Sequence, residues 1–336
     1  MINWGIIGCG DVTELKSGPA FNKVPHSTLV AVMRRDADKA KDYAQRHHVP
    51  KWYHDADQLI NDPDINAVYI ATPPSSHETY ALAAIAAGKF VYIEKPMALN
   101  YAAASNITKA ATLNDVKLVV AHYRRQQPYF KKLKQLIEEK KVGNIKHVHL
   151  VYYKASLTKD ELQVPKTAWR VNPLESGGGL FHDLAPHQLD ILYSLFGSVK
   201  KVSGISLNQS RNYEADDFVT GYMLFANGVV FNGIWSFNAP ASAERDCCEI
   251  IGSDGTISFS FFDNKPITVT TLDKTETFTF EPLQHVQLPM IERTVAYFLD
   301  LFPSNPCSGE EGAEVMRLME SFTERGQGLF DLQSPV

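Results

Sequence analysis

Short apolar runs alternate with amphipathic stretches over the first third of the chain. The runs span residues Ile2 to Ile7, Leu29 to Met33, Ala67 to Ala71, Phe90 to Ile93 and Leu118 to Ala121. Uninterrupted apolar runs of this length are typical of strands that are buried on both faces. Two of the intervening stretches, Asp36 to Arg46 and Tyr80 to Ala87, are predicted to be helices. The pattern indicates βαβ units and predicts a doubly wound parallel sheet.

The later part of the chain contains strand-like runs joined by turn signals. Phe218 to Phe225 and Val229 to Phe237 flank Ala226-Asn227-Gly228, which is a strong hairpin signal. Ser253-Asp254-Gly255 predicts a second turn before Thr256 to Phe261. Because 336 residues exceed the usual size of one hydrophobic core, we expect two domains. We expect residues 1–121 to form the first domain and residues 122–336 the second.

The first apolar run leads directly into Gly8-Cys9-Gly10-Asp11-Val12-Thr13. Two glycines at this position permit a tight turn and let backbone N–H groups approach a pyrophosphate. Thr13 replaces the third glycine of the usual pattern, and we expect it to loosen the packing of helix on strand slightly. The position after the first strand predicts dinucleotide binding by Gly8, Gly10, Asp11 and Val12.

The end of the second predicted strand bears on which dinucleotide is bound. An acidic residue there accepts a hydrogen bond from the ribose 2′-hydroxyl of NAD, whereas an arginine favours the 2′-phosphate of NADP. The sequence is Val32-Met33-Arg34-Arg35-Asp36, so Arg34 stands where the acid is expected. We predict NADP(H) as the preferred cofactor, with Arg34 on the phosphate and Arg35 beside it or stacked on the adenine. In the alternative, NAD(H) binds to Asp36, or Asp36 only caps the next helix.

The segment Thr72-Pro73-Pro74-Ser75-Ser76-His77 follows the third apolar run. The carboxyl ends of the strands in a doubly wound sheet are where ligands bind. We therefore place Thr72, Pro73 and His77 among the candidate cofactor contacts. For His77 alone, the favoured interpretation is a surface residue in the first turn of the following helix.

Glu94-Lys95-Pro96 closes the next predicted strand at the same edge of the sheet. A lysine at this position places an ammonium in the ligand crevice, where it stabilises negative charge that develops on an oxygen. The alternative is a surface lysine at the end of a strand. The sequence does not decide whether the bond before Pro96 is cis.

The segment from Gly177 to Asp190 carries Asp183, His187 and Asp190 at helical spacing, so these side chains share one helix face. A histidine flanked by carboxylates is suited to proton transfer near neutral pH. A structural Asp190–His187 pair is one alternative. A metal site is another, but His182 and His187 point to different helix faces, so we predict no bound metal.

Composition narrows the function classes. The formal net charge is −5, which argues against a nucleic-acid partner. No apolar run reaches the roughly 20 residues that a bilayer span requires, and the first strand begins too early to leave room for a signal peptide. We therefore expect a cytoplasmic protein with no membrane contact. The four cysteines lack CxxC spacing, so neither a disulfide framework nor a zinc site is predicted.

Together these motifs resemble the Gfo/Idh/MocA oxidoreductase family, named for glucose–fructose oxidoreductase and inositol dehydrogenase. The matching motifs are Gly8-Cys-Gly10, Ala71 to His77, Glu94-Lys95-Pro96 and the block from Gly177 to Asp190. The resemblance covers nearly the entire chain. It implies an N-terminal Rossmann domain, followed by a C-terminal α/β domain with a large, mostly antiparallel open sheet. It also implies a small-molecule substrate and a homodimer or homotetramer formed through that sheet.

Carried over residue by residue, the resemblance makes Lys95, Asp183 and His187 the catalytic group at the nicotinamide. In the family pattern, His187 transfers the proton, and Asp183 orients it or contacts a substrate hydroxyl. Lys95 binds the reacting oxygen, and Glu94 lies near the cofactor ribose.

Other positions are weaker candidates or depart from the family. Tyr123-Arg124 and Trp169-Arg170 are candidates to line the substrate pocket with His187, although each fits packing or a surface ion pair equally well. Ala185 stands where the family often has glycine. Because proline is accepted near a helix start, Pro186 predicts that this helix begins around Asp183.

The sequence predicts an NADP(H)-dependent oxidoreductase that moves a hydride between nicotinamide and a carbon of a sugar, cyclitol or related polyol. One alternative is the same chemistry on a non-sugar substrate such as a dihydrodiol. The other is a dinucleotide-sensing regulator without turnover, and the presence of Lys95, Asp183 and His187 counts against it.

Overall fold

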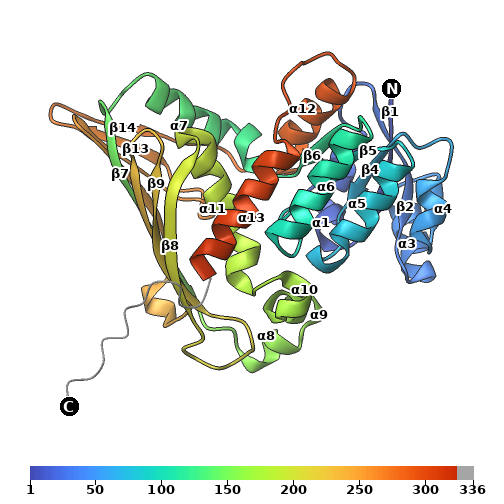
Figure 1. Cartoon of the computed structure of the whole chain (residues 1–336), viewed down its shortest axis with the longest axis horizontal. Coiled ribbons are helices and arrows are strands. Elements are labelled where there is room, and N and C mark those ends of the chain that lie inside the picture. The colour runs from blue at the N-terminus through green and yellow to red at the C-terminus, as the bar shows by residue number, and fades with distance from the viewer. Residues whose placement is uncertain (324–336) are drawn as a thin grey trace.

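The computed structural model describes residues 1–323. Within that range the chain forms two sheets with helices between and beside them (Figure 1). The first is a six-stranded parallel sheet in the order β3-β2-β1-β4-β5-β6. Its strands are β1 (Ile2–Ile7), β2 (Ser27–Met33), β3 (Lys51–Tyr53), β4 (Ala67–Ile70), β5 (Phe90–Ile93) and β6 (Leu118–Val120). The predicted doubly wound sheet is confirmed, and β3 is a short edge strand that the sequence pattern missed.

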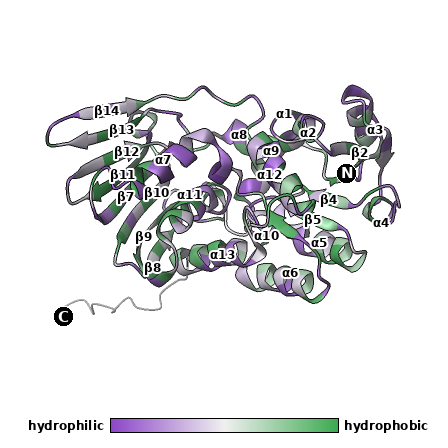
Figure 2. Cartoon of the chain, turned by 90° about the horizontal axis from the view of Figure 1, so that it is seen from above, coloured by the Kyte–Doolittle hydropathy of each residue, from purple (hydrophilic) through white to green (hydrophobic). Residues whose placement is uncertain are grey.

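Helices flank this sheet, as the βαβ pattern predicts. They are α1 (Asp11–Leu15), α2 (Gly18–Phe21), α3 (Ala37–Arg46), α4 (Ala56–Ile60), α5 (His77–Ala86) and α6 (Tyr101–Leu113), and the 3₁₀ turn η1 (Pro74–Ser76) precedes α5. Every residue of β4 is buried, and Figure 2 shows the neighbouring β5 as an apolar strand. The apolar runs of the sequence thus correspond to strands that are covered on both faces.

The second sheet has eight strands in the order β14-β13-β12-β11-β7-β10-β9-β8. Its strands are β7 (Ile145–Ala155), β8 (Val199–Leu207), β9 (Phe218–Phe225), β10 (Val230–Ala239), β11 (Arg245–Gly252), β12 (Gly255–Phe259), β13 (Ile267–Thr271) and β14 (Thr275–Phe278). β7 and β10 pair in parallel, and the other neighbours pair antiparallel. The mostly antiparallel open sheet is therefore confirmed, as are the two turns, where Gly228 adopts a φ of 88°.

The remaining helices lie mainly on one side of the second sheet (Figures 1 and 2). They are α7 (Pro128–Glu138), α8 (Lys159–Gln163), α9 (Pro165–Ala168), α10 (Pro173–Ser176), α11 (Leu180–Phe196), α12 (Leu288–Phe298) and α13 (Gly309–Thr323), with 3₁₀ turns η2 (Tyr123–Gln126), η3 (Trp169–Val171) and η4 (Ala241–Ala243). After the second sheet, α12 and α13 return to contact α2 and α6. These helices belong to the proposed second domain but pack against helices of the first sheet. The proposed boundary between two domains at residues 121 and 122 therefore stays a prediction.

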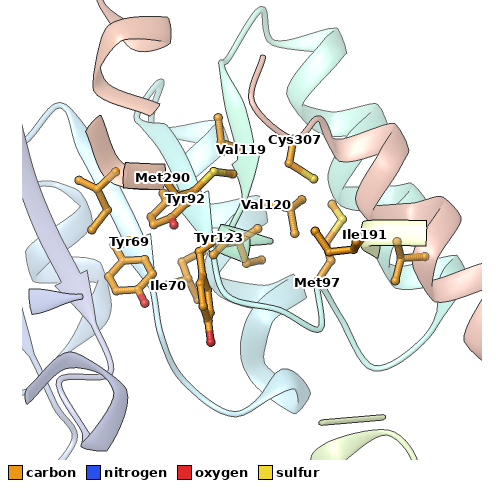
Figure 3. Packing of buried hydrophobic residues seen from close by; sticks show 14 of the residues in the cluster. Tyr69, Ile70, Tyr92, Met97, Val119, Val120, Tyr123, Ile191, Met290 and Cys307 are labelled. Atoms are coloured by element: carbon orange, nitrogen blue, oxygen red, sulfur yellow. The ribbon is translucent and has the colours of Figure 1, made fainter. Parts of the chain in front are cut away.

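A continuous apolar core joins the two sheets and the helices between them. Figure 3 shows part of this core. Tyr69 of β4 and Tyr92 of β5 stack with their ring centroids 5.1 Å apart. Met290 of α12 and Ile191 of α11 belong to the same buried cluster. The part of the chain that follows the parallel sheet is thus packed directly against it, which fixes α11 relative to β5.

The predicted start of α11 is wrong. The helix begins at Leu180, and Pro186 lies inside it. The preceding glycines permit this earlier start: Gly179 has a φ of 82°, and a Cβ atom on Gly178 would lie 2.1 Å from the His182 ring. The proline lacks the N–H that would bond to the carbonyl four residues earlier, and the helix nevertheless continues past it.

Candidate active site

The glycine loop between β1 and α1 has room for a ligand on one side. Gly8 has a φ of 93°, and a Cβ atom there would lie 2.9 Å from the backbone of Thr72. A Cβ atom on Gly10 would meet nothing closer than 3.9 Å, so the loop is open at that point. Thr13 is fully buried, and its hydroxyl donates to the Gly10 carbonyl at 2.7 Å. The loop therefore fits a dinucleotide pyrophosphate.

Arg34 lies next to the same loop. Its Nη1 donates to the Cys9 carbonyl at 3.3 Å, whereas Arg35 is exposed. Asp36 caps α3 by accepting from the Lys39 backbone N–H at 3.1 Å, and it also pairs with the Lys39 ammonium at 2.9 Å. The helix-capping role that the sequence offered for Asp36 is thus observed, and Arg34 is the side chain that turns toward the loop.

His77 is buried, so its interpretation as a surface residue is wrong. Its Nε2 lies 2.8 Å from the Thr72 carbonyl oxygen, and its Nδ1 lies 3.1 Å from the Pro96 carbonyl oxygen. Burial lowers the pKa of His77 to about 4, so the ring is neutral at pH 7. It connects the loop after β4, which includes the half-buried Pro73, to the Lys95–Pro96 segment, whose peptide bond is cis.

Lys95 and Asp183 form the centre of the candidate site. The Lys95 Nζ donates to the Asp183 Oδ1 at 2.9 Å and to the Asp183 carbonyl at 2.8 Å. Arg170 donates from Nε to Oδ2 of the same carboxylate at 3.0 Å, and its guanidinium lies 4.6 Å from the Trp169 ring centroid. Burial opposes ionisation of Asp183, but the charges of Lys95 and Arg170 outweigh it and lower the pKa of this carboxyl. The carboxylate is therefore ionised at neutral pH and holds both cations in place.

His187 lies one turn further along α11, between two aromatic rings. Its ring centroid is 5.1 Å from that of Tyr123 and 5.8 Å from that of Phe262. Burial and the nearby charges of Lys95 and Arg124 hold the pKa of His187 well below its usual value of 6.5. Its Nδ1 is buried and has no hydrogen-bond partner within the described range. The imidazole is therefore neutral at pH 7.

The two carboxylates on this helix face do not bond to His187 among residues 1–323. Asp183 binds Lys95 and Arg170, whereas Asp190 accepts from Arg125 Nε at 2.9 Å. The proposed structural Asp190–His187 pair is therefore wrong. The helical spacing placed the three side chains on one face, but each of them meets a different part of the protein.

Glu94 belongs to a buried network that the motif alone did not reveal. Its Oε1 accepts from the Tyr69 hydroxyl and from Gln287 Nε2, each at 2.5 Å. Tyr92 in turn donates to Gln287 Oε1 at 2.9 Å. Gln287 immediately precedes α12, so the later part of the chain helps to orient the Glu94-Lys95-Pro96 segment. Because this contact spans 193 residues of sequence, no local pattern could predict it.

One further residue near the site was missed, and two of the pocket candidates, Tyr123 and Arg124, line a cavity. Lys16, at the end of α1, lies close enough to Lys95 and Asp183 for their charges to act on its pKa, which burial lowers overall. A cavity of about 410 Å³ is lined by Tyr123, Arg124, Phe262 and residues 280–283. Cavities of this size are typical of small-molecule sites.

The helix α9 contacts α1, the helix that follows the glycine loop; Figure 2 shows the two close together. Lys166 of α9 pairs with Asp11 of α1 at 2.5 Å. Asp11 thus contacts α9 in the structure. Its predicted contact with the cofactor, like that of Val12, stays a prediction.

Neither a membrane-spanning helix nor a metal-binding cluster is found in the part of the chain that the structure describes. None of the helices there combines the length and apolar character that a bilayer span requires. No group of three or more His, Cys, Asp or Glu side chains is arranged to hold a metal ion.

Comparisons with known proteins agree with this fold and identify the family. Residues 2–122 match the Gfo/Idh/MocA model described as an oxidoreductase family with an NAD-binding Rossmann fold, and residues 130–258 match the Gfo/Idh/MocA C-terminal domain. The chain is 48% identical to Oxidoreductase P35 of Formosa agariphila over 96% of this chain and 98% of that protein. It is 29% identical to trans-1,2-dihydrobenzene-1,2-diol dehydrogenase of Mus musculus, over 68% of this chain and 66% of that protein. A levoglucosan dehydrogenase, solved with NADH and levoglucosan, superimposes with a TM-score of 0.82 at 22% identity and covers 96% of each chain.

Proposed function

Because the chain belongs to the Gfo/Idh/MocA oxidoreductase family, we propose that it transfers a hydride between NADP(H) and a carbon of a sugar, cyclitol or related polyol. The observation that supports this most directly is the Lys95–Asp183 ion pair, which lies at the carboxyl edge of the parallel sheet near His187. This edge is where a nicotinamide held by the glycine loop meets its substrate.

The bound nicotinamide supplies or accepts the hydride. In oxidation, Lys95 holds the substrate hydroxyl through its ammonium, and neutral His187 accepts the hydroxyl proton. In reduction, the same ammonium stabilises negative charge on the carbonyl oxygen, and the proton returns through His187 or Lys95. Asp183 acts by fixing the Lys95 ammonium and by keeping a negative charge beside it.

Arg34 supports a preference for NADP(H). Its side chain lies against the glycine loop, while Asp36 is engaged in capping α3 and pairing with Lys39. A 2′-phosphate would meet a guanidinium there, and a 2′-hydroxyl would meet no free carboxylate from Asp36. Arg34→Asp should shift the ratio of kcat/KM values toward NAD(H), whereas the same change at exposed Arg211 should leave the ratio unchanged. An unaltered ratio in the Arg34 variant would remove this residue from the role.

A polyol fits a site that combines Lys95, His187 and a cavity wall of aromatic rings and arginine. A protein of this fold binds NADH together with levoglucosan, so the fold can hold a sugar ring beside a nicotinamide. The dihydrodiol alternative is favoured by the similarity to the murine dehydrogenase. Both candidates carry hydroxyl-bearing carbons, and one substrate panel separates them.

The test is a nicotinamide absorbance assay in both directions with NADP(H) and NAD(H). The panel contains aldoses, ketoses, inositols, anhydro sugars, sugar acids and trans-dihydrodiols. Lys95→Met should lower kcat/KM roughly 100-fold or more while leaving cofactor affinity nearly unchanged. Lys109→Met, on the exposed face of α6, is the matched control. Full turnover in the Lys95 variant would contradict the mechanism, and turnover of dihydrodiols alone would contradict the polyol assignment.

We also propose that the chain forms a homodimer or homotetramer through the second sheet. The helices α7, α11 and α13 lie on one side of this sheet, and in the described part of the chain no helix covers the opposite side (Figures 1 and 2). The apolar residues Ile205, Leu207, Tyr222 and Val230 are exposed.

A further inference from the structure

Two cations near His187 lack a carboxylate partner. Lys95 and Arg170 both pair with Asp183, but within residues 1–323 neither Lys16 nor Arg124 forms an ion pair. Both charges are nevertheless close enough to His187 to lower its pKa. A positive charge that is partly removed from water is costly unless an opposite charge compensates it.

Arg124 is held in a defined orientation. Its Nη1 donates to the Phe261 carbonyl at 2.5 Å, and its guanidinium lies 4.6 Å from the Phe262 ring centroid. Its Nε is buried and has no partner among the described residues. Most of the hydrogen-bonding capacity of this guanidinium is therefore unused, although its position is fixed by the ring and the carbonyl.

The unused guanidinium lies in the wall of the cavity of about 410 Å³. Tyr123 and Phe262, the two rings that contact His187, line the same cavity. Glu281 also lines it, but this side chain is exposed to solvent and forms no ion pair with Arg124 in the described structure. A ligand in the cavity thus contacts Arg124. The same two rings that line this cavity also pack against His187, the proposed proton-transfer residue.

We propose that the substrate is a sugar acid, such as a uronate or an aldonate, whose carboxylate binds Arg124. This inference rests on the proposed function and deepens it by specifying the chemical class of the polyol. A neutral sugar offers hydroxyl acceptors to Arg124 but leaves its charge uncompensated, whereas a carboxylate supplies two acceptors and the missing charge. Lys16, which is exposed and also unpaired, adds a second positive charge that favours an anionic ligand.

A bound carboxylate would also change the environment of His187. The positive charges of Lys95, Arg124 and Lys16 all lower the pKa of this imidazole, and Tyr123 and Phe262 cover its ring. Burial keeps the neighbouring His122 neutral, because it lowers the pKa of that ring well below 6.5. A negative charge beside Arg124 offsets part of that positive field and makes His187 a stronger base. The substrate would thus help to prepare the group that removes its proton.

The experiment compares matched acid and neutral ligands by titration calorimetry with NADP(H) present. The pairs are D-glucuronate with D-glucose, D-galacturonate with D-galactose, D-mannuronate with D-mannose, and D-gluconate with D-sorbitol. At least one acid should bind roughly tenfold more tightly than its neutral partner. If no acid on the panel does so, the inference is wrong.

Variants locate the effect. Arg124→Gln should weaken binding of the preferred acid roughly 10- to 100-fold and should raise KM more than it lowers kcat, while binding of the neutral partner changes little. Arg124→Lys should recover part of the affinity, because it keeps the charge but loses the planar fork. Lys16→Met provides a second variant, which leaves the contact between Arg124 and Phe261 intact. It should weaken binding of the acid to a smaller extent than Arg124→Gln does. Arg211→Gln and Lys23→Met, both at exposed positions, are the matched controls.

The outcomes separate this inference from the proposed function. Preferential binding of an acid that is lost in Arg124→Gln, without nicotinamide turnover, would support the inference and contradict the proposed function. Turnover of neutral sugars with no preference for acids would support the proposed function and contradict the inference. An acid preference that persists unchanged in Arg124→Gln would overturn the assignment of Arg124.

Discussion

At the scale of single residues, the charge state of His187 decides which step it takes in the proposed mechanism. Burial and the charges of Lys95 and Arg124 lower its pKa well below 6.5. Asp183 cannot counteract this directly, because its carboxylate is engaged by Lys95 and Arg170. The imidazole is therefore neutral at neutral pH, and in the proposed mechanism this state suits removal of a proton from a substrate hydroxyl.

This charge state predicts the pH profile of oxidation. His187 is neutral above its lowered pKa and becomes protonated only below it, so kcat/KM should stay level as the pH falls through 6.5 and should decline well below that value. Asp183, whose pKa is also lowered, stays ionised across the same range. The measurement is kcat/KM for alcohol oxidation from pH 5 to pH 8, with His187→Asn as the comparison. An acid limb with a midpoint at or above 6.5 would show that His187 is not the base in this environment.

Sequence spacing predicted the composition of the site better than its contacts. The spacing of Asp183 and His187 correctly placed both on one helix face, and Lys95 does meet Asp183. It could not predict that Arg170 shares the carboxylate or that His77 is buried between two loops. Those contacts depend on how segments that are far apart in the sequence pack against each other. The local pattern of residues along the chain does not contain that information.

At the scale of elements, a network of buried ion pairs connects α11 to neighbouring elements. Asp190, with only 1% of its side chain exposed, pairs with Arg125 Nη2 at 2.7 Å. Arg125 also pairs with Glu311 of α13 at 2.6 Å through Nη1. One guanidinium thus ties α11 to η2 and to α13, on the same helix that carries Asp183 and His187.

Removing this guanidinium should be strongly destabilising. Arg125→Met leaves the Asp190 carboxylate buried without its partner, and breaking a buried pair in this way costs about 3–5 kcal/mol of unfolding free energy. Urea unfolding followed by circular dichroism measures the change. Lys134→Met, which removes an exposed pair with Glu138, should leave the unfolding midpoint nearly unchanged. Equal midpoints for the two variants would mean that the network does not hold α11.

Elements were predictable where one periodicity dominated. The buried strands of the parallel sheet stand out as apolar runs, and Asn227-Gly228 marks the β9–β10 hairpin. β7 was missed, although Val148, Leu150 and Tyr152 alternate along it and are buried. The start of α11 was misplaced because Pro186 is a local signal, whereas close packing of Gly178 on His182 permits the helix to begin before it.

At the scale of the whole molecule, the strand register separates the second sheet into two different faces. Val148, Leu150 and Tyr152 of β7 point toward the core, and the alternate residues point the other way. Through the pairing of β8, β9 and β10, Ile205 lies opposite Thr220, and Tyr222 lies opposite Asn232. The outward side therefore combines apolar and polar groups over several strands, as protein–protein interfaces do.

This face predicts the assembly state. Ile205 and Tyr222 are 39% and 45% exposed in the single chain, and burying them against a second copy of the sheet removes apolar area from water. Light scattering after size exclusion should give two or four times the chain mass of 37.5 kDa. The double variant Ile205→Glu/Tyr222→Glu should shift the mass toward a single chain, because it places charges opposite each other across a symmetric contact. Leu113→Glu, which alters an 85% exposed leucine at the end of α6, should leave the assembly intact. A wild-type mass of one chain, or a double variant that assembles like the wild type, would place the interface elsewhere or exclude it.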